Sequence, residues 1–217
     1  MRAKGAASAA GVIADVANGD AMDELARAAV AAMGGVDILV LNHGGPPQCT
    51  ASEMTEAQLV EWFQHIVVSP IRIATALLPA MRARGWGRII VVGSTGMQQP
   101  IPNLALSNTL RASIWAWLKT MSGEVAKDGV TMNVLAPGTI HTDRTNDSAA
   151  ALARRKNIGF EEALAERLAE AAAQIPAGRV GVPGEYGPMG AFLASDQAGY
   201  ITGSMVRVDG GRIRGMV

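Results

Sequence analysis

Two serines and an arginine in the middle of the chain are polar side chains whose types and spacing could bring them together. Ser94 comes just after a short apolar segment, Ser107 lies thirteen residues later, and Arg111 follows four residues after that. Residues four apart share one face of a helix, so Ser107 and Arg111 would point in the same direction. A hydroxyl can donate a hydrogen bond to a carbonyl oxygen, and a guanidinium adds fixed positive charge, but neither releases a proton near neutral pH. A serine after a strand is also common as an ordinary turn residue, and that interpretation stays open.

The histidines are the side chains best suited to act as an acid near neutral pH. His43 and His141 lie in loops after apolar segments, where either could exchange protons near neutral pH. No pair among these two and His65 has the short spacing of a metal site, and Cys49 belongs to no CxxC motif. We therefore expect no metal ion, and a histidine as substitute acid remains a hypothesis.

Short apolar segments alternate with longer amphipathic ones along the chain. This pattern predicts strands at residues 11–14, 36–41, 88–92, 130–135 and 205–208. It predicts helices at residues 20–33, 55–84 with a bend near Pro70, 104–126, two within 137–173, and 184–194. The alternation indicates an α/β fold with a Rossmann-like, doubly wound parallel sheet, in a single domain over residues 1–217.

Polar and glycine residues gather just after these predicted strands. Asp15, Asn42, Ser94 and Pro137 each follow the carboxyl end of one strand. In open parallel sheets, ligands bind in the crevice beyond these carboxyl ends. Gly44 would let the backbone approach a sugar or phosphate closely. Each of these short signals, taken alone, also fits an ordinary turn.

The composition argues against several classes of function. Basic and acidic residues both number 19, so no net charge draws the protein toward nucleic acid or an anionic membrane. No unbroken apolar run of about 18 residues exists, and the N-terminus lacks the apolar stretch of a signal peptide. The single Cys49 excludes an internal disulfide and fits a reducing compartment. We expect a cytoplasmic protein that binds neither nucleic acid nor membrane.

Four segments, in this order, resemble the short-chain dehydrogenase/reductase family. VDILVLNHGG at residues 36–45 resembles a strand that ends in Asn-Asn-Ala-Gly, and GWGRIIVVGS at 85–94 resembles the strand that delivers the catalytic serine. DGVTMNVLAPGTIHTD at 128–143 resembles the strand and loop that hold the nicotinamide, and YITGSMVRVDGG at 200–211 resembles the closing strand. The segments GGPP and PIPNLALSN are similar to a divergent branch of the 3-oxoacyl-acyl-carrier-protein reductases.

The resemblance implies an NAD(P)-dependent oxidoreductase of the 3-oxoacyl-acyl-carrier-protein reductase type. Its cofactor would be NAD or NADP, and its substrate a small carbonyl compound, an alcohol or an acyl thioester. Ser94, Ser107 and Arg111 would occupy the catalytic positions. The positions that would contact the cofactor, from the adenine through the ribose to the nicotinamide, are Asp15, Val16, Asn42, Gly44, Pro137, Gly138, Ile140 and Thr142.

Three departures from the family's pattern bear on that expectation. No Gly-rich turn of the pyrophosphate-binding kind precedes Asp15, and residues 1–10 resemble the tail of the family's second helix. We therefore expect the first two strands and the first helix to be missing. The family's Tyr and Lys are replaced by Ser107 and Arg111, and its relay Asn by about Ile66. The alternatives are a non-catalytic, dimerising or ligand-binding homologue and an inactive truncated product.

The resemblance also implies a homodimer or homotetramer, formed through the helices at 55–84 and 104–126. The expected contact residues lie at helical spacing on the second helix: Leu110, Ile114, Trp117, Leu118 and Met121. Trp115 and Trp117 are expected in the core or at the subunit interface. The strand at 36–41 would keep a bare edge unless the strand at 11–14 shifts inward, a partner chain pairs with it, or part of the fold is disordered.

Overall fold

A four-stranded parallel sheet forms the centre of the computed structural model, which describes residues 5–216. The strands are β1 (Ile38–Leu41), β2 (Gly87–Val92), β3 (Val130–Pro137) and β4 (Met205–Val208), and they lie side by side in that order. Each pair of neighbours is parallel. The predicted α/β class and the four strands after residue 35 are confirmed, with ends within two residues of those expected.

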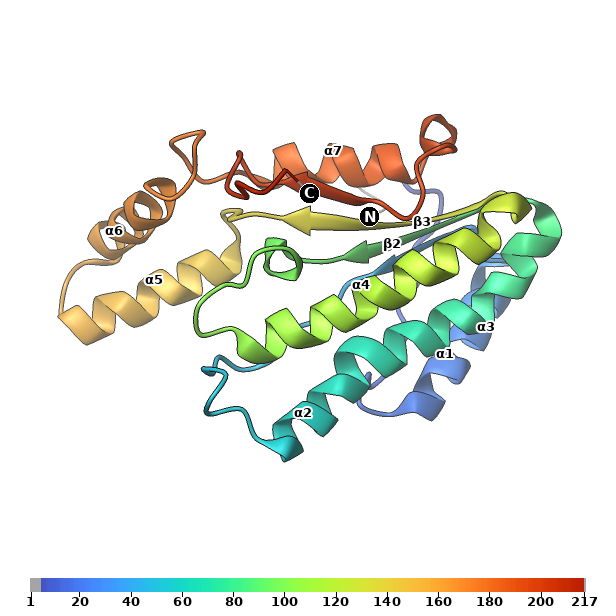
Figure 1. Cartoon of the computed structure of the whole chain (residues 1–217), viewed down its shortest axis with the longest axis horizontal. Coiled ribbons are helices and arrows are strands. Elements are labelled where there is room, and N and C mark those ends of the chain that lie inside the picture. Colours follow the sequence, from blue (N-terminus) through green and yellow to red (C-terminus); the bar gives the residue numbers. More distant parts are fainter. Residues whose placement is uncertain (1–4, 217) are drawn as a thin grey trace.

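Helices cover both faces of this sheet, as the doubly wound prediction requires (Figure 1). The helices are α1 (Gly19–Met33), α2 (Glu56–Phe63), α3 (Ser69–Arg84), α4 (Ala105–Val125), α5 (Asp143–Lys156), α6 (Phe160–Ala172) and α7 (Pro183–Leu193). In Figure 1, α7 lies above the sheet and α4 and α3 lie below it. The paired helices α5 and α6 project beyond the carboxyl ends of β2 and β3. The region beyond the strand ends therefore has walls on more than one side.

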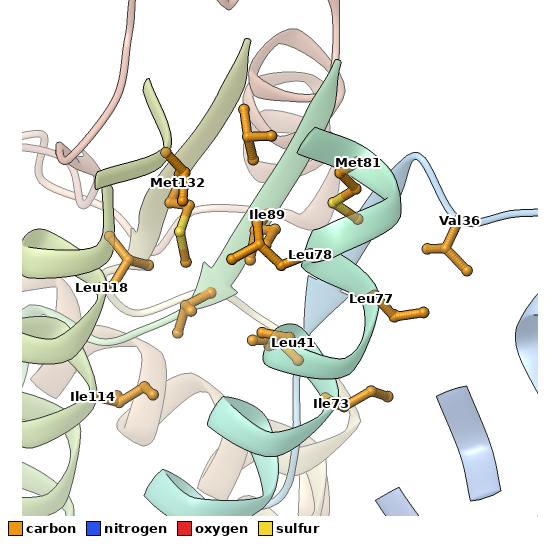
Figure 2. Close-up of a cluster of buried hydrophobic side chains, with 14 of the residues drawn as sticks. Val36, Leu41, Ile73, Leu77, Leu78, Met81, Ile89, Ile114, Leu118 and Met132 are labelled. Atoms are coloured by element: carbon orange, nitrogen blue, oxygen red, sulfur yellow. The ribbon is translucent and has the colours of Figure 1, made fainter. Parts of the chain in front are cut away.

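The main core lies between the sheet and the layer of α3 and α4 (Figure 2). β2 and β3 are buried on both faces because helices cover them above and below. Met81, Ile89, Leu118 and Met132 are almost completely buried in this cluster. Gly87 is needed here, because a Cβ at that position would lie 2.8 Å from the Met81 side chain. Packing of this kind fixes where β2 and β3 end, and so where their loops begin.

The predicted long helix contains a π-helical turn, Gln64–Val68, between α2 and α3. Pro70 follows this turn and lacks a backbone N–H, which accounts for the irregularity expected near it. The whole segment Glu56–Arg84 is long and apolar enough to cross a membrane by length and composition, although the sequence has no unbroken apolar run of that length. Half of its most apolar window, 50%, is buried inside the protein, as in an ordinary core helix.

The predicted strand at residues 11–14 is wrong. These residues have no strand assignment, and Val12 and Ile13 are exposed. A short extended segment becomes a strand only where a neighbour completes its hydrogen bonds, and no strand in the described part of the chain pairs with this one. Residues 5–10 are not helical either, and the first four residues lie outside the described part of the chain.

β1 is consequently an edge strand within the described residues, paired only with β2. Its Ile38 and Val40 side chains are 45% and 55% exposed. The expectation that residues 11–14 would shift inward to cover this edge is therefore wrong. Coverage of the edge by a partner chain remains a prediction.

Most of the apolar α4 residues expected to form the subunit contact are buried inside the protein. Three of them, Leu110, Ile114 and Leu118, are at most 2% exposed. They lie on the inner face of α4 and cannot form a subunit contact. Their four-residue spacing marks the face of α4 that packs onto the sheet and α2. Trp117 and Met121 are only partly buried, and Trp115 also packs against the main core.

Candidate active site and cofactor crevice

A cavity of about 400 Å³ opens beyond the carboxyl ends of the central strands. Five residues predicted from the sequence line it together: Ser94, Pro137, Gly138, Ile140 and Thr142. Its walls include the loop after β2, the loop after β3, the helix pair α5 and α6, and part of the C-terminal segment. The cavity lies where an open parallel sheet binds its ligands.

Ser94 is placed at the cavity by the end of β2 and by a short 3₁₀ turn, Thr95–Met97. Its Oγ accepts a hydrogen bond from the Gly96 N–H at 3.1 Å, so the hydroxyl oxygen is oriented by the backbone. The hydroxyl proton has no acceptor within the described residues and remains able to donate to a ligand. The residue is half-buried, which suits a hydroxyl that contacts a bound carbonyl oxygen.

Ser107 and Arg111 do meet on one face of α4, as their spacing predicts. Arg111 donates from Nε to the Ser107 Oγ at 3.3 Å and from Nη1 to the carbonyl oxygen of Val92 at 3.1 Å. Burial and the nearby charge of Arg144 lower the pKa of Arg111 from its ordinary value. An arginine stays charged under such conditions and cannot relay a proton. Neither side chain lines the cavity beside Ser94.

His43 lies near this arginine and is mostly neutral at neutral pH. Burial, with the charges of Arg111 and His65 adding to it, holds the pKa of His43 below its ordinary value. Its Nδ1 is 2.6 Å from the Gly44 carbonyl oxygen, which only accepts, so Nδ1 carries the proton and Nε2 accepts. His43 in this state is better suited to accept a proton than to donate one.

His141 and Tyr186 offer no free acid either. His141 Nε2 lies 2.9 Å from the Asn146 Oδ1, and its ring does not line the cavity. Tyr186 is distant from α4 in sequence, yet in the structure it lies close enough to Arg111 for that charge to act on its pKa. Its hydroxyl donates to the Leu135 carbonyl oxygen at 3.1 Å, and burial raises the pKa of Tyr186 to about 12.

The loop from β3 to α5 is held rigidly on the cavity wall. Its Thr139 carbonyl accepts from the Gly181 N–H at 3.0 Å, and the His141 N–H donates to the Gly181 carbonyl at 2.8 Å. A Cβ on Gly138 would lie 2.6 Å from the Cα of Asp209, the residue just after β4, so this close approach of the two backbones is enough to require glycine here. Thr142 then starts α5 as its N-cap residue.

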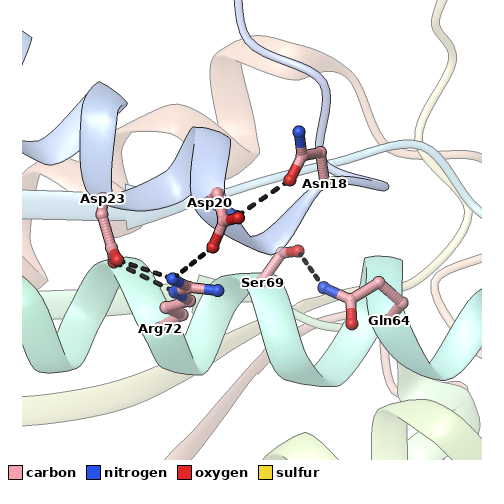
Figure 3. A network of polar contacts seen from close by, with 6 residues as sticks. All are labelled: Asn18, Asp20, Asp23, Gln64, Ser69 and Arg72. Carbon is pink, nitrogen blue, oxygen red and sulfur yellow. Dashed lines mark hydrogen bonds and ion pairs between the residues drawn. The ribbon is translucent and has the colours of Figure 1, made fainter.

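Asp15 and Val16 form an exposed turn that is tied to α3. The Ser69 hydroxyl donates to the Val16 carbonyl oxygen at 2.6 Å and accepts from the Gln64 side chain at 3.1 Å. Figure 3 shows Ser69 and Gln64 beside the α1 side chains that pair with Arg72 of α3. The Asp15 carboxylate accepts from the Ala17 N–H at 2.9 Å. The turn is well anchored, but it does not line the cavity beside Ser94.

Ion pairs fix α1 against α3 in the same network (Figure 3). The Arg72 guanidinium lies 2.8 Å from Asp20 and 2.7 Å from Asp23. The Asn18 side chain caps α1 by accepting from the Asp20 N–H at 2.9 Å. The N-terminus of α1 is thus closed by its own cap and faces an acidic side chain, an arrangement unlike a phosphate-binding turn.

Asn42 and Gly44 follow the carboxyl end of β1 and are exposed to solvent. Space around Gly44 is open, since a Cβ there would meet nothing within 4 Å. The rigid loop after β3 fits the nicotinamide end of a dinucleotide, and the open backbone at Gly44 would leave room for a sugar. Within residues 5–216 no strand, Gly-rich turn and helix follow one another in the way that holds a pyrophosphate.

Three arginines on the cavity were missed by the sequence reasoning: Arg144, Arg167 and Arg212. Arg144 comes from the first turn of α5, and Arg212 follows the Gly-Gly that ends the closing segment. No periodicity or motif marks them, because they come together only when α5, α6 and the C-terminal segment pack around one space. Among residues 5–216, no three His, Cys, Asp or Glu side chains form a group that could hold a metal ion.

Known proteins are similar to this chain in both sequence and fold. A family model described as enoyl-(acyl carrier protein) reductase matches residues 1–212. The 3-oxoacyl-[acyl-carrier-protein] reductase MabA of Mycobacterium tuberculosis is 34% identical over 202 residues, which cover 93% of this chain and 75% of MabA. The reductase FabG of Vibrio cholerae, of the same description, is 35% identical over 201 residues, covering 93% and 76%.

A solved structure agrees at the level of the fold. The L-sorbose reductase of Gluconobacter frateurii, crystallised with NADPH and L-sorbose, is 32% identical and superposes with a TM-score of 0.87. The superposition covers 94% of this chain and 77% of that protein.

Proposed function

The chain belongs to the short-chain dehydrogenase/reductase family, and from that premise we propose that it is an oxidoreductase of the 3-oxoacyl-[acyl-carrier-protein] reductase type. It would use NAD or NADP and act on a small carbonyl compound or an acyl thioester. The observation that carries the proposal is the position of Ser94 on one cavity with Pro137, Ile140 and Thr142.

The residues on this cavity suit a reaction at a carbonyl carbon. A bound nicotinamide cofactor would supply the hydride. The Ser94 hydroxyl, oriented by the Gly96 N–H, would donate a hydrogen bond to the carbonyl oxygen and stabilise the negative charge that develops there. Pro137, Ile140 and Thr142 would hold the nicotinamide end, and Arg111 would offer its charge and remaining donors to the ribose.

Proton transfer is the weak step of this site. Ser107 accepts a hydrogen bond from Arg111, and a serine hydroxyl is far too weak an acid to replace a tyrosine. His43 is held in its neutral form by burial and nearby charge, so it is a poor donor at neutral pH. We therefore propose slow turnover, with water or His43 completing the proton balance.

The second candidate is a non-catalytic homologue that binds ligands or dimerises. The closed contact between Ser107 and Arg111 favours it, because this contact occupies the positions where the family's pattern places an acid.

Two measurements separate these candidates. NADPH fluorescence is titrated with the protein, and NADPH oxidation is followed with an acetoacetyl thioester, in the parent protein and in Ser94→Ala. Binding with slow turnover that Ser94→Ala abolishes supports the oxidoreductase, whereas binding with no turnover supports the non-catalytic homologue. Absence of NADPH binding contradicts the proposed cofactor.

A further inference from the structure

Arg212 is a half-buried cation whose partners are all neutral. Its Nη1 donates to the Thr139 Oγ1 at 2.7 Å, and its Nη2 donates to the Gln174 Oε1 at 3.3 Å. The nearest acid along the chain, Asp209, instead accepts hydrogen bonds from the N–H groups of Gly211 and Ile213, both at 3.0 Å. No ion pair joins Arg212 to an acidic side chain within the described residues.

The guanidinium lies between two cavities. It lines the space of about 400 Å³ beside Ser94 and a neighbouring space of about 320 Å³ between the loop after β2 and the C-terminal segment. Thr95 and Ile101 line both spaces as well, so the two are adjacent. A ligand that contacts Ser94 therefore has Arg212 within the same crevice.

The other charges on the crevice have the same sign. Arg144 and Arg167 line the space beside Ser94, and Arg214 lines the neighbouring one. Arg167 is paired with Glu170 at 3.0 Å, but Arg144 has no ion pair among residues 5–216. Among residues 5–216, no Asp or Glu lines either space.

A cation withdrawn from water without a counter-charge is costly, and an anion at the same place offsets that cost. We propose that the crevice beside Ser94 takes a carbonyl substrate that carries an anionic group, a carboxylate or a phosphate, bound by Arg212. The inference rests on the proposed function, since it assigns the substrate class of that site. Arg144 adds to the positive potential and steers the anion, and Arg212 forms the direct contact.

The test compares ligands that differ only in charge. Dissociation constants are measured by ligand-observed NMR for acetoacetate against acetoacetamide, and for dihydroxyacetone phosphate against dihydroxyacetone. A charge-assisted hydrogen bond predicts about a tenfold or greater preference for at least one anion over its neutral partner. Arg212→Gln should reduce that preference to about twofold or less, while Arg212→Lys should keep much of it. Arg154→Gln, an exposed arginine of α5 that lines neither space, is the matched control and should leave it unchanged.

Each result decides the matter. A preference for acetoacetate alone identifies an oxo acid, and one for dihydroxyacetone phosphate alone identifies a phosphate-bearing substrate. Equal or unmeasurable binding of the charged and neutral ligands overturns the proposal, as does a preference that persists in an Arg212→Gln protein with parental thermal stability. If Arg212→Gln weakens NADPH as much as the anions, the arginine serves the cofactor's phosphates and the proposal is wrong. Failure of NADPH to bind the parent protein counts against the proposed function alone, because the anion preference is measured without cofactor.

Discussion

The Arg111 guanidinium donates to the Ser107 hydroxyl oxygen across one turn of α4, with 3.3 Å between Nε and Oγ. The same guanidinium also holds the end of β2 through the Val92 carbonyl. The pair therefore stabilises the strand end from which the chain continues to Ser94. It joins a fixed cation to a very weak acid, so it has no proton to give.

Restoring an acid at this place should raise reductase activity. The variant Ser107→Tyr with Arg111→Lys places a phenol beside an ammonium group, which lowers the phenol pKa towards a useful range. General acid catalysis contributes about a hundred- to ten-thousand-fold, so we expect turnover of an acetoacetyl thioester to rise by about a hundredfold if Ser94 faces the substrate. Thr120→Tyr, at an exposed position of the same helix, is the control and should change nothing. Brisk reduction by the parent protein would instead show that another group, with His43 and His141 as first candidates, donates the proton.

The half-buried His43 should make the protein less stable in mild acid. Its pKa in the folded protein lies below the 6.5 of an unperturbed histidine, so the unfolded chain binds the proton more readily. The stability that neutral His43 contributes is complete above about pH 6.5 and is lost as the pH falls towards the folded pKa. Thermal unfolding of the parent and of His43→Asn, compared between about pH 7.5 and pH 5.5, should show the smaller loss in the variant. Identical pH dependence would mean that His43 is not desolvated.

The bare edge of β1 should make the protein prone to aggregate. Val40 is 55% exposed on this edge strand, and a lysine there opposes edge-to-edge pairing. Val40→Lys should therefore lower light scattering on heating. Val60→Lys alters a 65% exposed valine on α2, which has no unpaired strand edge, and should have a smaller effect. Equal effects of the two variants would point to general hydrophobicity instead of the edge.

Self-association remains a prediction, although most of the residues first expected to carry it are buried within one chain. Trp117 and Met121 remain partly exposed on α4, and β1 offers an unpaired edge. We expect light scattering at micromolar concentration to give the mass of a dimer or tetramer. A monomer mass across that range would contradict this expectation.

The strands that sequence patterns located best are those covered on both faces. β2 and β3 are rich in apolar residues and buried along almost their whole length, because α3, α4 and α7 pack on them from two sides. Residues 11–14 have the same kind of composition, but the state of a short segment depends on a neighbour that no local pattern reveals. Whether such a segment becomes a strand depends on pairing with another strand in the folded protein.

The candidate site could be predicted from the sequence only at residues that directly follow a recognisable strand. Ser94, Pro137 and Thr142 follow strand ends, and the structure places all three on one cavity. Arg212 could not be predicted in this way, because its position depends on how the C-terminal segment packs against Thr139 and Gln174. The charges that line a crevice depend on how distant segments pack around it, so no local sequence pattern predicts them.

The hydrogen bond from Arg212 to Thr139 joins the C-terminal segment to the loop after β3. A ligand that draws the guanidinium towards itself must compete with the Thr139 hydroxyl, and so changes how firmly that loop is held. By thermodynamic linkage the effect is reciprocal: whatever orders the loop alters the affinity of Arg212 for that ligand by the same factor. A ligand bound by Arg212 would thereby be coupled to the state of the loop after β3 through a single side chain.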